Sequence, residues 1–251
     1  MPEPARRTGV QAIARAGAVL RALEAEPRGL ALGEIAAAVE LPKSTVHRLV
    51  AALVEEDLLT QEAGGKIRLG NGLARLAAAS REALADRLRP VLLDLRRELD
   101  ETVDLAVLDD DAVRFVDQIP APRRLHAAAA VGELFPLHCT ANGKALLAAM
   151  PTEEATARLP VPLPRFTPKT IVSCEKLLAE LAQVRSTGVA FDHEEHTEGI
   201  CAVGAIVSDP DGAAAAISVP VPSQRFGGRE EILADAVRRA TANASKLLTS
   251  G

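Results

Sequence analysis

The hydrophobic pattern between residues 32 and 54 predicts two short helices joined by a tight turn. In the second helix, apolar residues recur at i, i+3, i+4, i+7 and i+8, which is the stripe of an amphipathic helix. These positions are Val46, Leu49, Val50, Leu53 and Val54. The first helix has Ile35 and Val39 on its inward face and a small residue, Ala36, where the helices would cross. Pro42 suits the first turn of the second helix, where no N–H group is needed. The segment therefore has the spacing of a helix-turn-helix.

Polar and basic side chains gather at the start of the second helix, mostly outside its apolar stripe. They are Lys43, Ser44, Thr45, His47 and Arg48. Side chains at the N-terminal end of a recognition helix are the ones that reach base edges in the major groove of DNA. We therefore predict that these residues bind DNA. The alternative is an ordinary bundle of amphipathic helices, and Glu40 stands at the turn position where Gly is frequent because φ can be positive there.

A wing is predicted after the helix-turn-helix. Two strand-like runs, residues 57–62 and 66–69, flank a Gly-rich hairpin signal at residues 63–65. Lys66 and Arg68 alternate on one face of the second run, which suits contact with phosphates and adds both to the predicted DNA-binding residues. Ahead of the motif, apolar residues at helical spacing predict a first helix that closes a three-helix core. They are Ile13, Ala16, Leu20 and Leu23. Residues 9–70 are thus predicted to form a winged helix-turn-helix DNA-binding domain, mainly α.

A linker helix is predicted next, because an apolar stripe continues from Asn71 to Arg87. We assign residues 71–88 to this linker. Pro90 is expected to end it and to restart the chain in a new helix, which makes Pro90 a natural hinge. A plain helix within one domain is the alternative, but the stripe has no other obvious partner and offers a surface on which two copies of the chain could pair.

From residue 89 to residue 251 the pattern mixes strands and helices. Strand-like runs cover residues 103–107, 112–119, 125–131, 189–192, 201–207 and 213–221. Helical patterns cover residues 142–150, 152–158 and 174–187, and a closing amphipathic helix runs from Ile232 to Leu247. The sequence Asp-Pro-Asp-Gly at residues 209–212 is a strong hairpin signal between the last two strands. Antiparallel strands with helices packed on the sheet make an α+β domain.

Composition and charge agree with two modest domains in the cytoplasm. A chain of 251 residues is long enough for one or two domains that each bury a core. No uncharged apolar stretch reaches 18 residues, so we expect no membrane-spanning helix. Three cysteines without close pairing favour a reducing compartment over a disulfide framework. The net charge of −5 comes from residues 72–251, with 20 Lys and Arg against 25 Asp and Glu, whereas residues 1–71 balance 9 with 9. Affinity for DNA must therefore come from local placement of cations.

One cluster suggests a different function. Residues 192–196 read Asp-His-Glu-Glu-His, so a metal-binding protein or an enzyme that uses the segment from His193 to Cys201 is an alternative. A zinc protease motif needs two histidines four residues apart on one helix, but His193 and His196 are three apart after a strand-like run. A nucleophilic cysteine needs a base within hydrogen-bond reach, and the side chain of a sequence neighbour such as His138 usually points elsewhere. We therefore expect Cys139 to be buried. We assign no catalytic residue, no metal ligand and no cofactor.

Three motifs in a fixed order span nearly the whole chain. The first is Leu-Pro-Lys-Ser-Thr-Val-His-Arg-Leu at residues 41–49, with the Gly-Gly wing and Arg-Leu-Gly at residues 68–70 after it. The second is Pro-Leu-His-Cys-Thr-Ala-Asn-Gly-Lys-Ala at residues 136–145, and the third is Gly-Val-Ala-Phe-Asp-His-Glu-Glu-His at residues 188–196. Together they resemble the IclR (isocitrate-lyase-regulator) family of bacterial transcriptional regulators. Two positions depart from that pattern: Ala202 stands where many members have Cys, and Ile206 stands where Pro is common.

The resemblance implies that the C-terminal domain is a GAF-like effector-binding domain. Its pocket, carried over by position, would be built from Thr140, Ala141, Asn142, Gly143, Asp192, Ala202 and Ser218. Backbone N–H groups at the start of the helix after Asn142 could hold a carboxylate, since helix N-termini favour anions. With no Trp, no Tyr and 5 Phe in the chain, we expect aliphatic walls around a small organic or aromatic acid. Lys144 is interpreted as one half of a structural ion pair.

The sequence therefore predicts a cytoplasmic, non-enzymatic transcriptional regulator with two domains joined by a linker helix. It is expected to be a repressor that binds double-stranded DNA at a palindromic operator and responds to a small-molecule effector. The resemblance implies homodimers that can join into homotetramers. A further alternative is a DNA-binding protein whose C-terminal domain only oligomerises.

Overall fold

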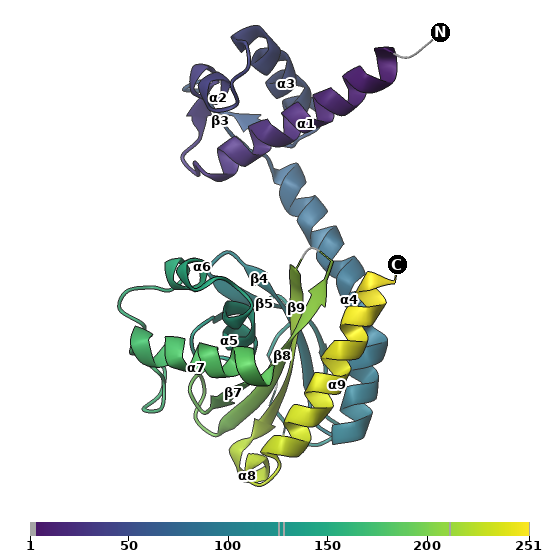
Figure 1. Ribbon diagram of the computed structural model, residues 1–251, viewed down its shortest axis with the longest axis vertical. Coiled ribbons are helices and arrows are strands. Elements are labelled where there is room, and N and C mark those ends of the chain that lie inside the picture. The colour runs from purple at the N-terminus through teal and green to yellow at the C-terminus, as the bar shows by residue number, and fades with distance from the viewer. Residues whose placement is uncertain (1–3, 125, 128, 211, 251) are drawn as a thin grey trace. The chain divides into compact units, whose positions relative to one another are not determined.

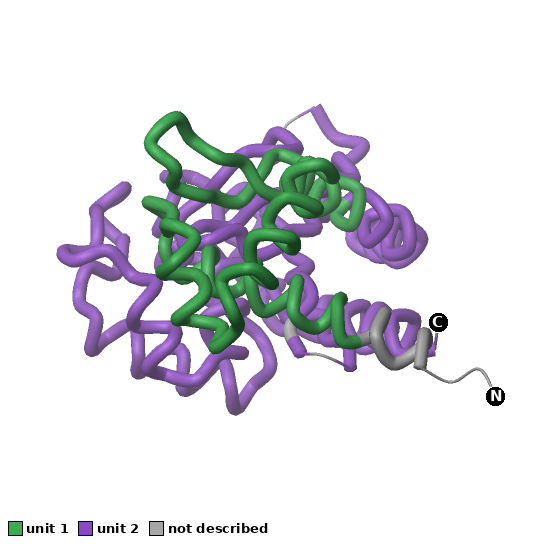
Figure 2. The backbone as a smooth tube through the Cα atoms, turned by 90° about the horizontal axis from the view of Figure 1, so that it is seen from above, with its two compact units in different colours: residues 1–81 green, residues 82–251 purple. Residues whose placement is uncertain are grey.

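The computed structural model describes residues 4–124, 126–127, 129–210 and 212–250, with side chains from residue 11 onward apart from that of Ala213. The chain divides into two compact units, residues 1–81 and residues 82–251 (Figure 2). Each unit has its own buried hydrophobic residues. Within the described ranges, no helix is long and apolar enough to cross a membrane.

The described part of the first unit contains three complete helices, the start of a fourth and a small antiparallel sheet. The complete helices are α1 (Pro4–Glu24), α2 (Leu32–Ala38) and α3 (Lys43–Glu55). The strands are β1 (Leu30–Ala31), β2 (Leu59–Gln61) and β3 (Lys66–Leu69), in the order β1-β3-β2. Val19, Ile35 and Val46, one from each helix, are all 0% exposed and form the centre of the core. This is the predicted winged helix-turn-helix fold.

The turn between α2 and α3 requires a left-handed backbone. Glu40 has a φ of 52°, so this position has the conformation for which Gly is favoured, and a glutamate occupies it. Helix α3 begins directly after Pro42, whose φ of −57° is already close to the helical value. Val50 and Leu53 of α3 are buried, as the periodicity predicts. The turn therefore holds the start of α3 outside the core.

Helix α4 (Asn71–Leu99) continues through Pro90, so the expectation that Pro90 ends the linker helix and begins another is wrong. A proline inside a helix removes one hydrogen bond and costs roughly 3 kcal/mol. The residues on either side are deeply buried, since Leu88 and Leu92 are both 0% exposed. Burying such side chains is worth roughly 1.5–3 kcal/mol each, which outweighs the cost of the proline. The boundary between the two compact units falls inside this helix, after residue 81.

The second unit is built on a six-stranded antiparallel sheet in the order β6-β5-β4-β9-β8-β7. The strands are β4 (Val103–Asp109), β5 (Ala112–Ile119), β6 (Leu134–Pro136), β7 (Ala190–His193), β8 (Ile200–Asp209) and β9 (Gly212–Pro222). On one face lie α5 (Ala141–Ala148), α6 (Thr152–Ala157) and α7 (Cys174–Thr187) (Figure 1). On the other lie the C-terminal part of α4, the short α8 (Ser223–Phe226) and α9 (Glu230–Thr249). The predicted α+β architecture is confirmed.

Alternation along the strands separates two hydrophobic cores. Leu105 and Ile217 are buried with the leucines of α4 and the apolar stripe of α9. Their sequence neighbours Ala106 and Ala216 are buried with α5, α6 and α7 on the opposite face. Because successive side chains of a strand point to opposite faces, each central strand contributes to both cores.

One expected strand does not form in the described part of its segment. Residues 126–127 and 129–130 have no regular secondary structure, while Leu125 and Ala128 of the same prediction lie outside the described residues. The shorter strand β6 pairs with β5 instead. The chain turns at Gly132, which has a φ of 91°, and a strand cannot continue through that conformation.

Four apolar residues that were expected to face the cores are exposed instead. Ile13 is 75% exposed, Ile232 is 60% exposed, Leu247 is 48% exposed and Val54 is 36% exposed. Each lies near an end of the apolar stripe of its helix, where periodicity still fits but no neighbouring element covers the side chain. In each of these helices, the buried part of the apolar stripe is therefore shorter than the periodic pattern suggests.

Helix α5 lies very close to neighbouring backbone. A Cβ atom at Gly143 would stand 2.2 Å from the carbonyl oxygen of Leu137. A Cβ atom at Gly204 of β8 would stand 3.1 Å from the backbone of Ala141. Glycine is needed at Gly143, and Gly204 leaves little room for any side chain, so the start of α5 rests almost directly on the sheet.

We expect Gly143→Ala to destabilise the protein by roughly 1–3 kcal/mol, because the added methyl group would collide with backbone that cannot rotate aside. Urea denaturation measures the loss. The matched control is Gly227→Ala, whose Cβ atom would meet no other atom within 4 Å. That control should change stability by less than about 0.5 kcal/mol. Two variants of equal stability would contradict the close approach.

Candidate DNA-binding surface and effector pocket

The side chains predicted to bind DNA lie at the start of α3. Lys43, Ser44, His47 and Arg48 are exposed, and Thr45 is partly buried. Val46 is 0% exposed and anchors the helix to the core beneath them. Positions three and four apart share a helix face, so Ser44, His47 and Arg48 present one continuous polar surface.

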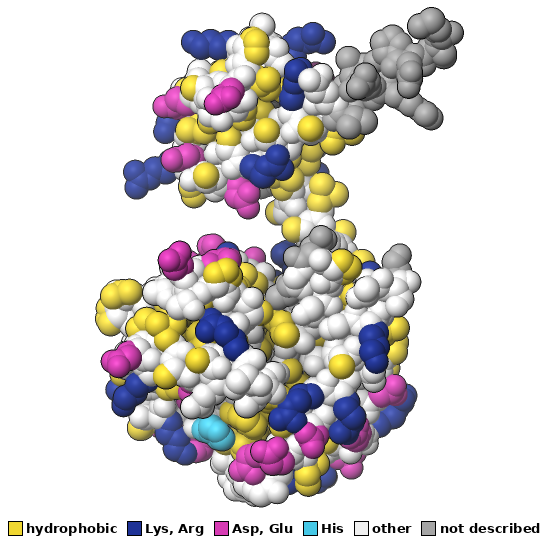
Figure 3. Space-filling model, in the orientation of Figure 1, with side chains coloured by type: hydrophobic (Ala, Val, Ile, Leu, Met, Phe, Trp, Pro, Cys, Tyr) yellow, Lys and Arg dark blue, Asp and Glu magenta, His cyan; other side chains and the backbone are white. Residues whose placement is uncertain are grey.

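The hairpin of the first unit presents two further cations. Lys66 and Arg68 are exposed on β3, whereas Ile67 between them is 1% exposed. Arg68 Nη1 lies 3.1 Å from Glu62 Oε1, and both side chains are more than two-fifths exposed. Exposed ion pairs of this kind contribute roughly 0–1 kcal/mol, so a phosphate can replace the glutamate. Figure 3 shows Lys and Arg side chains at several points on the visible surface of this unit.

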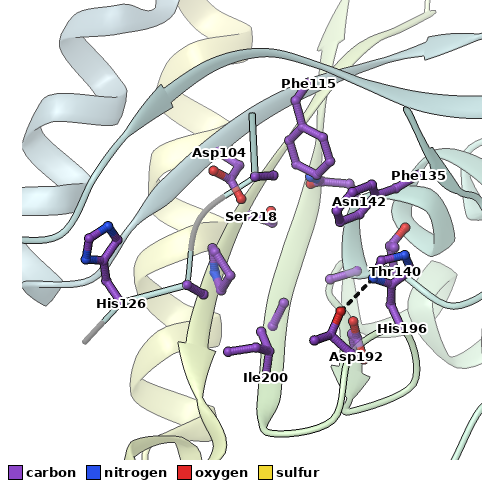
Figure 4. A pocket seen from close by; sticks show the side chains of 16 residues that line it. Asp104, Phe115, His126, Phe135, Thr140, Asn142, Asp192, His196, Ile200 and Ser218 are labelled. Atoms are coloured by element: carbon purple, nitrogen blue, oxygen red, sulfur yellow. Dashed lines mark hydrogen bonds between the residues drawn. The ribbon is translucent and has the colours of Figure 1, made fainter. Parts of the chain in front are cut away.

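The second unit contains a cavity of about 310 Å³ that the start of α5 and the sheet enclose (Figure 4). Six of the seven residues that the family resemblance implies line this pocket. They are Thr140, Ala141, Asn142, Asp192, Ala202 and Ser218. Gly143 does not line it, and its place is at the close contact with the backbone of Leu137.

Aromatic rings form part of the pocket wall, so the expectation of purely aliphatic walls is wrong. Phe115 and Phe135 meet edge to face with ring centroids 4.9 Å apart. The imidazole of His196 stacks on Phe135 with centroids 4.2 Å apart. The composition is low in aromatic residues, but the fold brings two of its 5 Phe to this one place. Smaller apolar residues, Ile200, Ala202 and Pro220, also line the pocket.

The start of α5 presents polar groups to the pocket. Thr140 caps the helix, because its Oγ1 accepts a hydrogen bond from the Gly143 N–H at 3.1 Å and donates one to the Pro136 carbonyl at 2.9 Å. Asn142 is 2% exposed, and its Oδ1 has no hydrogen-bond partner in the described part of the chain. The first N–H groups of a helix have no partner within the helix. Thr140 satisfies the Gly143 N–H, while the nearby Oδ1 of Asn142 is an acceptor without a partner among the described residues.

Two buried carboxyl groups enter the pocket from different sides (Figure 4). Asp192 of β7 is 5% exposed and accepts a hydrogen bond from the Glu195 N–H at 2.7 Å. Asp104 of β4 is 3% exposed and accepts one from Gln118 Nε2 at 2.7 Å. Burial raises the pKa of each carboxyl to about 7. The residues that line the pocket include no Lys or Arg to oppose this shift.

Lys144 lies behind the pocket and forms the structural ion pairs expected of it. Its side chain is 0% exposed, and Nζ lies 2.5 Å from Glu180 Oε1 of α7 and 2.6 Å from Glu195 Oε1. The charge of Lys144 is therefore balanced by two glutamates of the second unit, and Lys144 does not line the ligand cavity.

The residues considered as a metal or enzyme site point in different directions. His193 is exposed and stacks on Phe191, whereas His196 lies against Phe135. No group of three or more His, Cys, Asp or Glu side chains within the described ranges is arranged to hold a metal ion. Burial raises the pKa of the Cys139 thiol to about 12 and that of Cys201 to about 11. At neutral pH both thiols are protonated and are poor nucleophiles.

The sequence analysis does not identify several of the residues that line the pocket. They are Asp104, Phe115, His126, Phe135 and His196. The strand pattern contains one signal for them, since Asp104 alternates with the core residues Val103 and Leu105 and must face the opposite side. The sequence does not reveal what covers that side.

The first unit has a winged helix-turn-helix fold, and the second is an α+β unit with a cavity that polar side chains line. This combination defines a class of protein, the ligand-responsive DNA-binding regulator. The family model described as "IclR helix-turn-helix domain" matches residues 12–63. The model described as "Bacterial transcriptional regulator IclR C-terminal" matches residues 76–246. The chain belongs to the IclR family of bacterial transcriptional regulators.

Similar proteins are named as transcriptional regulators or as IclR homologues. HTH-type transcriptional regulator Rv1719 of Mycobacterium tuberculosis is 49% identical over 92% of this chain and 90% of that protein. TtgV of Pseudomonas putida, also named an HTH-type transcriptional regulator, is 36% identical over 96% of this chain and 92% of its own length. A solved IclR homologue from Microbacterium hydrocarbonoxydans, in complex with 4-hydroxybenzoate, has a TM-score of 0.62 at 25% identity and covers 96% of this chain and 100% of its own. The protein is a DNA-binding transcriptional regulator of the IclR type.

From the two buried carboxyl groups of Asp104 and Asp192 we predict how the free energy of unfolding depends on pH. Each folded pKa of about 7 lies above the ordinary value of 3.8, so the folded state keeps its protons as the unfolded state loses them. Stability should therefore fall as pH rises from about 4 to about 7, by at most roughly 1.4 kcal/mol per pH unit for each group. Asp104→Asn removes one of these groups, so its stability relative to the wild type should rise across that range and level off above it.

Chemical denaturation at a series of pH values measures this difference. Asp86→Asn, at an exposed position on α4, is the matched control and should give a curve parallel to that of the wild type. A curve for Asp104→Asn that is also parallel to the wild type would contradict the assignment of a raised pKa.

Proposed function

We propose that the protein is a repressor whose affinity for its operator changes when a small acid occupies the pocket of the second unit. The observation that carries this proposal is the cavity at the start of α5, where the buried Oδ1 of Asn142 has no hydrogen-bond partner among the described residues. A buried polar atom without a partner is costly, at roughly 1–3 kcal/mol, so a ligand or water that donates a hydrogen bond to this oxygen is favoured. The exposed polar start of α3 supplies the second requirement, a surface for DNA.

The effector is an organic or aromatic acid in this proposal. The backbone N–H groups at the start of α5 favour an anion. Near neutral pH the raised pKa of Asp192, about 7, leaves part of that carboxyl protonated and able to donate a hydrogen bond to a carboxylate. The rings of Phe115 and Phe135 suit an aromatic body, and the homologue from Microbacterium hydrocarbonoxydans binds 4-hydroxybenzoate.

The DNA-bound form is a homodimer or a homotetramer on a palindromic operator. One recognition helix reads too few base pairs for useful specificity, so two copies related by a two-fold axis bind two half-sites. Helix α4 offers a surface for pairing, because Leu76 is 61% exposed in the segment 71–88 that we propose as the linker. DNA would be held by the side chains at the start of α3 and by the cations of the hairpin.

The pocket and the DNA-binding surface are coupled through this linker. Ligand and DNA can influence each other only when the ligand binds two arrangements of the chain with different affinity. The segment 71–88 is the covalent connection between the proposed domains 9–70 and 89–251. A change in how two such segments pair would alter the spacing of the recognition helices. Regulation of this kind needs no chemical transformation of the effector, so the proposal includes no enzymatic activity.

Arg48→Ala should weaken binding to the DNA upstream of the gene by roughly 1–3 kcal/mol and relax its sequence preference, because the side chain is exposed where α3 would meet bases. Fluorescence anisotropy with the native duplex and a scrambled duplex measures both effects. Lys66→Ala is the comparison: it should weaken both duplexes alike and reduce the slope of affinity against salt by about one phosphate contact. Unchanged affinity and selectivity in Arg48→Ala would disprove this assignment.

Asp192→Ala and Ser218→Val should weaken the effect of ligand on operator affinity while leaving ligand-free DNA binding nearly unchanged. Both residues line the pocket, and neither belongs to the first unit. Operator affinity is measured by anisotropy with and without 4-hydroxybenzoate as the probe. Asp235→Asn, at an exposed position on α9 outside the pocket lining, is the control and should keep the full response. A full response in both pocket variants would mean that the effector binds elsewhere.

A further inference from the structure

The pocket has a second polar end that the proposed carboxylate site does not use. Asp104 of β4 and Ser218 of β9 stand directly opposite each other in the antiparallel pair. Each is 3% exposed and each lines the cavity. Figure 4 shows Asp104 reaching the cavity from a different side from Asp192 and Thr140. The acid end of a ligand would therefore leave this pair free for a second group.

The Asp104–Ser218 pair has hydrogen-bonding capacity to spare. A carboxylate offers about four acceptor positions on its two oxygens. In the described part of the chain, the hydrogen bond to Asp104 comes from Gln118 Nε2. The hydroxyl of Ser218 can both donate and accept. Since the pocket lining holds no Lys or Arg, a ligand group that donates a hydrogen bond is the partner that this end lacks.

The space between the two ends suits a flat ring. Phe115 and Phe135 border it with their rings, and Ile200, Ala202 and Pro220 add small apolar surfaces from β8 and β9. A cavity of about 310 Å³ lies at the lower end of the range for small-molecule sites. A single substituted aromatic ring fills such a slot, with one polar substituent toward each end.

The geometry points to Asp104 and Ser218 as the recognition site for a hydroxyl group on the ring of an aromatic acid, at the end opposite to its carboxylate. This inference rests on the proposed function of the pocket and deepens it, because it narrows the effector class to hydroxylated aromatic acids. A second carboxylate at this end has no hydrogen atom to donate and would repel the ionised form of Asp104, so aromatic diacids are disfavoured. A methyl group in place of the hydroxyl would leave the polar pair buried without a partner.

Matched probes test this inference in the full-length protein. Isothermal titration calorimetry compares 3- and 4-hydroxybenzoate with 3- and 4-methylbenzoate, in which a methyl group of similar size replaces the hydroxyl. At pH 8, where Asp104 with its pKa of about 7 is mostly ionised, at least one hydroxybenzoate should bind about tenfold to a hundredfold tighter than its methyl counterpart, since a methyl group cannot donate a hydrogen bond to that carboxylate. Asp104→Leu should reduce this ratio to near one, because it weakens binding of the hydroxybenzoate and removes the buried carboxyl that a methyl group leaves without a partner.

Two further variants keep the result interpretable. Asp104→Asn is the conservative variant, which keeps an acceptor and should retain part of the preference if Asp104→Leu fails to fold. Asp117→Asn is the matched control, because this buried aspartate pairs with Arg89 and does not line the pocket. It should keep the full preference for the hydroxyl.

The outcomes separate this inference from the proposed function. Equal affinities for hydroxyl and methyl probes in the wild type would overturn the hydroxyl site while leaving the effector pocket intact. A preference that survives unchanged in both Asp104 variants would also overturn it. Binding of none of the four probes at millimolar concentration would overturn the aromatic effector itself, and the hydroxyl site with it.

Discussion

The effector pocket depends on one buried ammonium group that does not touch it. Lys144 ties α5 to Glu180 of α7 and to Glu195 in the loop after β7. Removing a partner from such a buried pair is strongly destabilising, because an uncompensated charge remains in the interior. The backbone of Glu195 in turn donates to Asp192 and accepts a hydrogen bond from Thr170 Oγ1. The position of the pocket carboxyl is therefore set by contacts that begin at this cation.

The same arrangement explains the unusual electrostatics of the cavity. Lys144 is paired with two glutamates, and the residues that line the pocket include no Lys or Arg beside the buried Asp104 and Asp192. Their raised pKa values follow from burial, and the cavity is polar without carrying a positive charge. Such a site distinguishes ligands by hydrogen bonds and protonation, whereas a lysine or arginine would attract any anion.

Local patterns were sufficient for the first unit and insufficient for the pocket. The stripe that begins at Val46 and the Gly-rich hairpin are short-range signals, and both elements form as predicted. Pro90 shows the limit of such signals, since burial of Leu88 and Leu92 overrides a strong local preference. The pocket residues Asp104, Phe115 and Phe135 come from three strands and meet only through the sheet order, which no local pattern contains. Sequence motifs could therefore indicate Thr140, Asn142 and Asp192 through the family resemblance, but not the wall that faces them.

The two faces of the sheet in the second unit have different roles, and this affects how such a regulator can change its ligand preference. Asp104 and Ser218 stand beside Leu105 and Ile217 along their strands but point to the opposite side, so the residues that choose the ligand alternate with those that hold the fold together. A substitution at either pocket position leaves the core under α4 and α9 intact. Ligand preference can therefore change through positions that the core beneath α4 and α9 does not use, and a new chemical signal can be acquired without a new scaffold.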